Sequence, residues 1–205
     1  MSLTVEQLRE GIDAVAGLEP RVAAALARVG YPEPRERGRG YATLLRTILG
    51  QQVSFLAADA MWRKFVGMAT DAADPRALLA LDDVALRSCG FSRQKAAYGR
   101  GLAEAVATGA LDFDALPADD EEAIAVMVAL KGIGRWSAEI YLLFSEGRAD
   151  IFPAGDLAVQ IEVGRIMGLD ERPSEKTTRA IAEAWRPWRG AMATFLWHHY
   201  KTDVI

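Results

Sequence analysis

The stretch LKGIGRWSAE at residues 130–139 places two glycines and a tryptophan in a short connection between two predicted helices. Because Gly132 and Gly134 have no Cβ, they permit positive φ and leave their backbone N–H groups unshielded. Successive exposed N–H groups at the start of a helix form a concave donor site for an anion. The connection therefore fits a phosphate group. A tight helix-helix turn with glycine caps is the alternative, and the glycines alone do not decide between them.

A second feature with chemical potential is Asp156, which follows Pro153 and Gly155 and precedes a segment of helical periodicity. An aspartate in this position usually caps the helix by accepting N–H bonds from its first turn. A cap also holds the carboxylate rigidly. A fixed carboxylate kept out of bulk water can stabilise positive charge that develops in a transition state. Capping and catalysis are compatible roles for this residue.

The composition of the 205 residues is that of an ordinary globular protein, with 51% apolar and 25% charged residues. The net charge of −4 counts against nucleic-acid binding over the whole surface, although residues 87–100 carry bases without acids. The single cysteine, Cys89, excludes an internal disulfide, a thiolate zinc cage and a four-cysteine iron-sulfur cluster. The N-terminus lacks a signal peptide's apolar region and no apolar run is long enough to span a membrane, so we expect a cytoplasmic protein.

Apolar residues recur at three-to-four-residue spacing along nearly the whole chain, which predicts amphipathic helices. No segment alternates apolar and polar residues long enough to indicate a sheet, and we therefore expect an all-α fold. The predicted helices cover residues 4–16, 20–29, 41–49, 52–66, 76–88, 93–107, 119–129, 135–145, 156–167, 175–185 and 188–200.

Several motifs, in order and at matching intervals, resemble those of the helix-hairpin-helix DNA glycosylase superfamily. Asp156 lies 20 residues after Trp136, as in the branch that includes the bacterial enzymes for 3-methyladenine. The other matching segments are ILGQQVS at residues 48–54, GFSRQKA at 90–96, and RPWR at 186–189 followed by LW at 196–197. The resemblance extends over most of the chain, and its combination of motifs is specific.

The resemblance implies two helical subdomains with a cleft between them. Residues 1–39 and 150–205 would form one subdomain, and residues 40–149, with the hairpin at 130–136, would form the other. The whole chain, 1–205, would be one glycosylase module without the N-terminal β-rich domain of the longer bacterial relative.

The implied activity is base excision from damaged double-stranded DNA by a monomeric enzyme. The target base would be flipped out, and its N-glycosidic bond hydrolysed with Asp156 as the catalytic carboxylate, leaving an abasic site. Family members that also cut the strand carry a lysine where this chain has Trp136, and Lys131 lies before the glycines. The resemblance thus implies a monofunctional enzyme without lyase activity.

The same resemblance assigns the base pocket to Trp136 and Trp197, although either tryptophan alone is more often a core residue. Electron-rich rings attract cations, and N-alkylated purines such as 3-methyladenine and 7-methylguanine are cationic. Ile140 stands where the bacterial relative has a pocket tyrosine, with Tyr141 beside it. A more apolar or wider pocket would shift preference towards ethenoadenine or N1-methyladenine.

The resemblance also assigns residues to the gap in the base stack, to other DNA contacts and to a cation. The wedge that fills the gap left by the flipped base falls on Gln52, which is otherwise an ordinary polar residue at a helix start. The other residues that the motifs assign to DNA are Gln51, Ser54, Arg93, Lys95, Gly132, Ile133, Gly134 and Arg135. We expect no cofactor, apart from a monovalent cation held by the backbone carbonyls of Val128, Leu130 and Ile133.

Three other functions remain open at this point. The same chemistry could act on oxidised or deaminated bases, which the argument for a cationic base disfavours. A helix-hairpin-helix module could bind DNA without catalysis, in which case Asp156 would have no purpose at its family-like position. An all-helical protein-interaction domain could contain the GIG turn by chance.

Overall fold

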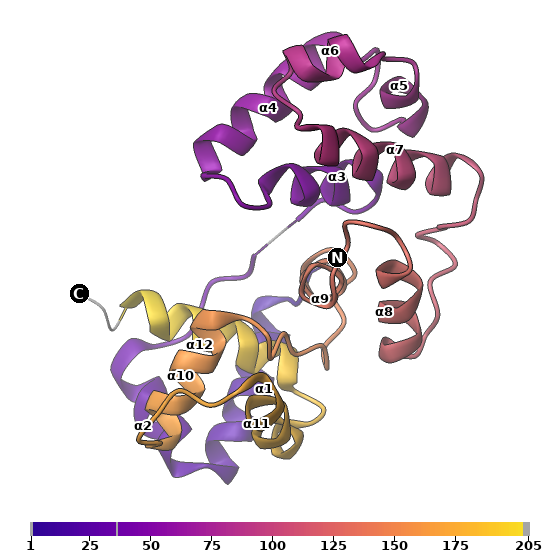
Figure 1. Cartoon of the computed structure of the whole chain (residues 1–205). Coiled ribbons are helices and arrows are strands. Elements are labelled where there is room, and N and C mark those ends of the chain that lie inside the picture. Colours follow the sequence, from indigo (N-terminus) through magenta and orange to yellow (C-terminus); the bar gives the residue numbers. More distant parts are fainter. Residues whose placement is uncertain (1, 36, 203–205) are drawn as a thin grey trace. The chain divides into compact units, whose positions relative to one another are not determined.

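The computed structural model describes residues 2–35 and 37–202, and over these ranges it is helical with no β-strand (Figure 1). The expected all-α fold is confirmed. None of the described helices is long and apolar enough to cross a membrane. The contacts between Cα atoms divide the chain into two compact units. We call Met1–Arg37 with Leu142–Ile205 the terminal unit, and Gly38–Tyr141 the central unit.

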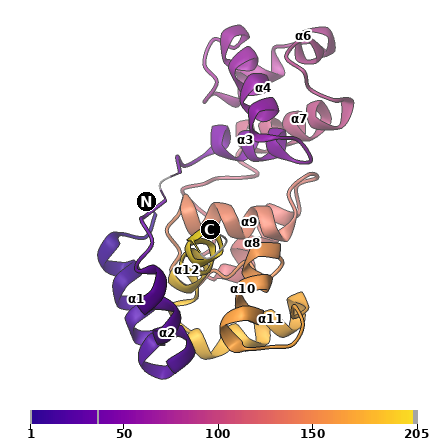
Figure 2. The same ribbon diagram turned by 90° about the vertical axis from the view of Figure 1, so that its left-hand side faces the viewer.

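The terminal unit is built around its last helix, α12 (Arg189–Thr202), on which α1, α2 and α10 pack (Figure 2). Residues on all sides of α12 are buried, as expected for a helix surrounded by others. The remaining elements of this unit are α1 (Val5–Leu18), α2 (Pro20–Val29), α10 (Leu157–Met167), α11 (Glu175–Ala182) and the short 3-10 helix η1 (Glu183–Trp185).

The central unit packs α3 against α4 and α7, and α5 against α7, around buried side chains such as Leu45, Phe65 and Leu78. Its helices are α3 (Tyr41–Gly50), α4 (Phe55–Met68), α5 (Pro75–Leu79), α6 (Asp83–Ser88), α7 (Arg93–Ala107), α8 (Asp120–Val128) and most of α9 (Arg135–Phe144).

In two predicted helical segments, a capping side chain makes a helix begin later than the apolar pattern indicates. The helix predicted over 52–66 begins at Phe55, since Gln52 has a left-handed φ of 56° and Ser54 caps the helix through the N–H of Ala57. The segment predicted as one helix over 76–88 is two, because Asp82 accepts a hydrogen bond from the N–H of Ala85 and starts α6.

The chain passes from the central to the terminal unit within α9, between Tyr141 and Leu142, whereas the motifs placed this boundary near residue 150. The last turn of α9 belongs to the terminal unit because its side chains pack there. The Phe144 ring lies 5.5 Å from the ring of Trp197, measured between centroids.

The connection between α8 and α9 depends on glycine at one of its two glycine positions. Gly132 has a φ of 94°, which side-chain-bearing residues rarely adopt, and a Cβ there would overlap the ring of Tyr98. Gly134 has no positive φ, and a Cβ there would meet no atom within 4 Å. Gly132 therefore shapes the turn, while Gly134 keeps its outer side open.

We predict that Gly132→Ala lowers the free energy of unfolding by about 2–4 kcal/mol, from backbone strain together with overlap with Tyr98. The matched substitution Gly134→Ala should change it by less than ~0.5 kcal/mol. Urea denaturation followed by circular dichroism measures both values. Equal effects of the two substitutions would contradict this description of the turn.

Candidate functional site

Asp156 is the N-cap of α10, in extended backbone conformation, as the sequence predicted for the residue before this helix. Its Oδ1 accepts hydrogen bonds from the N–H groups of Ala158 at 3.0 Å and Val159 at 3.1 Å. The side chain is half-buried, and residues 151–154 shortly before it are buried. The carboxylate is therefore held by the backbone of the helix that follows it.

A third donor to the same oxygen comes from α12. The indole Nε1–H of Trp197 donates to Oδ1 of Asp156 at 3.0 Å, and the Trp197 side chain is only 8% exposed. The structure thus brings together two of the predicted site residues. The hydrogen bond to the Asp156 carboxylate is also a role of Trp197 that the sequence spacing did not predict.

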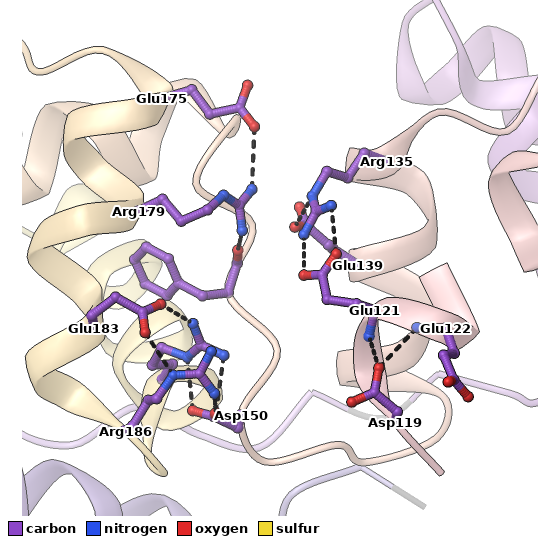
Figure 3. A network of polar contacts seen from close by, with 12 residues as sticks. Asp119, Glu121, Glu122, Arg135, Glu139, Asp150, Glu175, Arg179, Glu183 and Arg186 are labelled. Atoms are coloured by element: carbon purple, nitrogen blue, oxygen red, sulfur yellow. Dashed lines mark hydrogen bonds and ion pairs between the residues drawn. The ribbon is translucent and has the colours of Figure 1, made fainter. Parts of the chain in front are cut away.

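The segment before Asp156 is tied down by ion pairs within the terminal unit, shown among the sticks of Figure 3. Asp150 receives two hydrogen bonds from Arg189, from Nε at 2.8 Å and from an Nη at 2.9 Å, in the paired geometry that guanidinium groups favour. Arg189 is buried, and the next residue, Gly190, donates its N–H to the carbonyl of Ala149 at 2.7 Å. The RPWR motif thereby fixes the start of the loop that ends at Asp156.

A guanidinium group lies against the aromatic side of this site. The Arg35 Cζ is 5.6 Å from the centroid of the Trp197 ring and 5.9 Å from that of Phe144. Burial lowers the pKa of Arg35, and attraction to Asp156 opposes that effect. Arg35 was not among the predicted site residues, since nothing in the proline-rich stretch around it indicates a contact with α12.

In the central unit, Trp136 lies in the first turn of α9 and is 43% exposed. Its neighbour Arg135 donates to Glu121 at 2.8 Å and to Glu139 at 2.9 Å (Figure 3). The hydrogen bond to Glu121 raises the pKa of Arg135 above its ordinary value. Arg135 thus fastens α8 to α9, a role that the prediction of a DNA contact did not include.

The two other predicted pocket residues are core residues of the central unit. Ile140 and Tyr141 are 4% and 2% exposed. The Tyr141 hydroxyl accepts a hydrogen bond from the N–H of Gly40 at 2.8 Å, and its ring packs against Phe113. These contacts account for both residues as packing groups, and a pocket role remains a prediction.

We call residues 51–54, which contain the predicted wedge residue Gln52, the wedge turn. A side chain joins this turn to the hairpin. Gln51 donates from Nε2 to the carbonyl of Gly132 at 2.8 Å. The next residue, Gln52, is exposed and is the one described non-glycine residue with positive φ. Such strained conformations in a non-glycine residue cluster at functional sites. Lys95 donates to the carbonyl of Leu49 at the end of α3, which fixes the other side of the turn.

Two further residues assigned to DNA begin helices near this turn. Ser54 is the exposed N-cap of α4, and Arg93 is the exposed first residue of α7. The structure brings Gln51 to the hairpin directly, but gives no contact of Ser54 or Arg93 with it. Their place in DNA binding remains a prediction.

Comparison with known proteins identifies the family to which the chain belongs. Residues 45–187 match the family described as HhH-GPD superfamily base excision DNA repair protein. The chain belongs to this superfamily. The matched range includes the wedge turn, the hairpin and Asp156.

Three relatives of this HhH-GPD protein are matched over at least 90% of their own length. DNA-3-methyladenine glycosylase 1 of Schizosaccharomyces pombe is 28% identical over 98% of this chain and 94% of the relative. The structure of that organism's 3-methyladenine DNA glycosylase Mag1 in complex with abasic DNA has a TM-score of 0.81 and covers 96% of this chain and 97% of that one. A DNA-3-methyladenine glycosidase from Bacillus halodurans, also 28% identical, has a TM-score of 0.87 and covers 95% and 90%.

The polar side chains of this HhH-GPD protein do not suggest a transition-metal centre. Within residues 2–35 and 37–202, no three His, Cys, Asp or Glu side chains are grouped so as to hold a metal ion. His199 instead bonds Glu162 through Nδ1 at 2.5 Å, inside the terminal unit. This hydrogen bond accounts for His199 as a structural residue of the terminal unit.

We predict that Asp156 and Trp197 are energetically coupled. In a double-mutant cycle with Asp156→Ala and Trp197→Phe, the coupling free energy should be about 1–2 kcal/mol, because the removed N–H donates to a carboxylate. Chemical denaturation of the four proteins measures it. A control cycle combines Asp119→Ala, at the N-cap of α8, with Trp197→Phe. Its coupling free energy should be near zero. Coupling below ~0.3 kcal/mol between Asp156 and Trp197 would contradict the hydrogen bond.

Proposed function

We propose that this chain is a monofunctional DNA glycosylase, acting as a monomer, that removes alkylated bases of the 3-methyladenine and 7-methylguanine type from double-stranded DNA. Membership of the HhH-GPD superfamily and the names of its relatives support DNA base excision of this kind. The observation that carries the assignment in this chain is Asp156, a half-buried carboxylate with three hydrogen-bond donors on one oxygen.

The proposed reaction breaks the bond between C1′ of the deoxyribose and the base nitrogen. The bonding electron pair leaves with the base, and the sugar becomes an oxocarbenium-like cation. The Asp156 carboxylate stabilises this charge, because it is fixed before the charge develops and needs no reorganisation. The oxygen of a water molecule then bonds to C1′, and its proton passes through the carboxylate to solvent.

Contacts with the DNA backbone and the base stack are assigned to the central unit. The base must leave the stack before hydrolysis, at a cost of a few kcal/mol. Gln52 is proposed to occupy the gap, since it is exposed and held in a strained turn between Gln51 and Ser54. No atom lies within 4 Å of the position that a Cβ would take at Gly134, and the backbone N–H groups at this start of α9 are proposed to bind a phosphate.

A monovalent cation at the hairpin is consistent with the chemistry of the carbonyls of Val128, Leu130 and Ile133. Carbonyl oxygens are hard ligands of the kind that alkali-metal ions accept. The Leu130 oxygen already accepts the Ile133 N–H at 3.1 Å, and a carbonyl has a second lone pair. When bound, such an ion would neutralise part of the phosphate charge near the hairpin.

We predict that Asp156→Asn lowers the single-turnover rate of 7-methylguanine release by at least ~10²-fold, because the amide retains the cap but not the charge. Thermal unfolding should change little. Asp119→Asn, the same substitution at the N-cap of α8, is the matched control and should leave the rate unchanged. Excision at the wild-type rate by purified Asp156→Asn protein would refute the catalytic assignment. Salt-sensitive DNA binding without base release in the wild type would identify a non-catalytic module instead.

We also predict that the reaction passes through no covalent enzyme–DNA intermediate, because Trp136 occupies the hairpin position of the lysine that forms a Schiff base in lyase members. Sodium borohydride added during turnover should trap no adduct, and the product should be an intact strand with an abasic site. A lyase-active family member treated in parallel shows that the trapping works. A trapped adduct that disappears in Lys131→Arg would overturn the prediction.

A further inference from the structure

The aromatic face expected to receive a cationic base already carries a cation. Arg35 lies over the ring of Trp197 at 5.6 Å from its centroid, and over Phe144 at 5.9 Å. A tryptophan face at this distance attracts a cation through its ring quadrupole. With Arg35 there, that face of Trp197 is not available to an alkylated base. All three side chains belong to the terminal unit.

This arginine is also close to the catalytic carboxylate. The ring that it covers donates its N–H to Oδ1 of Asp156 at 3.0 Å, so a single indole connects the two charged groups. Burial lowers the pKa of Arg35, and the smaller effect of the Asp156 charge acts in the opposite direction. The terminal unit therefore presents a carboxylate and a guanidinium together.

In the proposed reaction, the carboxylate of Asp156 would act on the sugar end of the bond that breaks, and the guanidinium of Arg35 on the base end. The electron pair of the C1′–N bond goes to the base, while C1′ gains positive charge and then binds the oxygen of water. A cationic base such as 7-methylguanine departs neutral. A neutral damaged base such as ethenoadenine or hypoxanthine departs as an anion and takes a proton from solvent after release. A fixed cation stabilises only the second transition state, and it repels the first kind of base in the bound state.

On this basis we propose that Arg35 is a specificity-determining residue, which stabilises the negative charge on neutral damaged bases as they depart and so extends the substrate range beyond alkylated cations. The inference rests on the proposed function. The stable charge and planar donors of a guanidinium suit this role.

The test compares single-turnover rates on two duplexes, one with ethenoadenine and one with 7-methylguanine. In Arg35→Gln, the rate on ethenoadenine should fall at least ~10-fold relative to that on 7-methylguanine, since one charged group is lost from one transition state. Arg35→Lys, which keeps the charge, should recover most of the ratio. Arg9→Gln removes another arginine stacked on a ring of the same unit, over Tyr31, and should leave the ratio unchanged.

The possible results separate this inference from the proposed function. Equal losses on both duplexes in Arg35→Gln would mean that Arg35 only supports Trp197 and Asp156, and would overturn the inference. An unchanged ratio, or a wild-type enzyme that releases 7-methylguanine but no ethenoadenine, would also overturn it and leave the proposed function intact. If the wild type released neither base, the proposed function itself would fail.

Discussion

The site depends on three N–H groups that converge on one oxygen of Asp156. Two come from the first turn of α10 and the third from Trp197 on α12. In the proposed reaction, a carboxylate held in this way would stabilise the positive charge on the sugar without reorganisation. The burial of α12, the ion pairs of Asp150 and the cap of α10 all maintain this geometry.

In the central unit, hydrogen bonds and close packing likewise hold two turns of the backbone in place. Its wedge turn is determined by Lys95 on one side and by Gln51 on the other, and its hairpin by Gly132 against Tyr98. Lys95 satisfies a carbonyl in the last turn of α3, Gln51 satisfies a carbonyl of the hairpin loop, and Gly132 gives that loop its shape. The side chains expected to meet DNA are thus carried by turns that the fold itself holds rigid.

Much of the fold was predictable from local sequence, because helical periodicity and caps depend on neighbouring residues. The start of α10 and the role of Asp156 as its cap follow from Pro153, Gly155 and the periodicity after them. The split between α5 and α6 was missed because the apolar pattern continues across Asp82. The contacts of Arg35 and the hydrogen bond from Trp197 to Asp156 were not predictable, since they join segments far apart in the chain. The position of Asp156 after the hairpin indicated a catalytic group, but not what holds it.

The hydrogen bond from Gln51 to the carbonyl of Gly132 has an evolutionary consequence. It ties the end of α3 to the loop before α9, so a residue inserted into either loop would shift two surface features at once. Length variation among homologues should accordingly be excluded from these two loops and tolerated in others of the central unit, such as the one between α7 and α8. Because of this hydrogen bond, the two loops should evolve together as one structural unit.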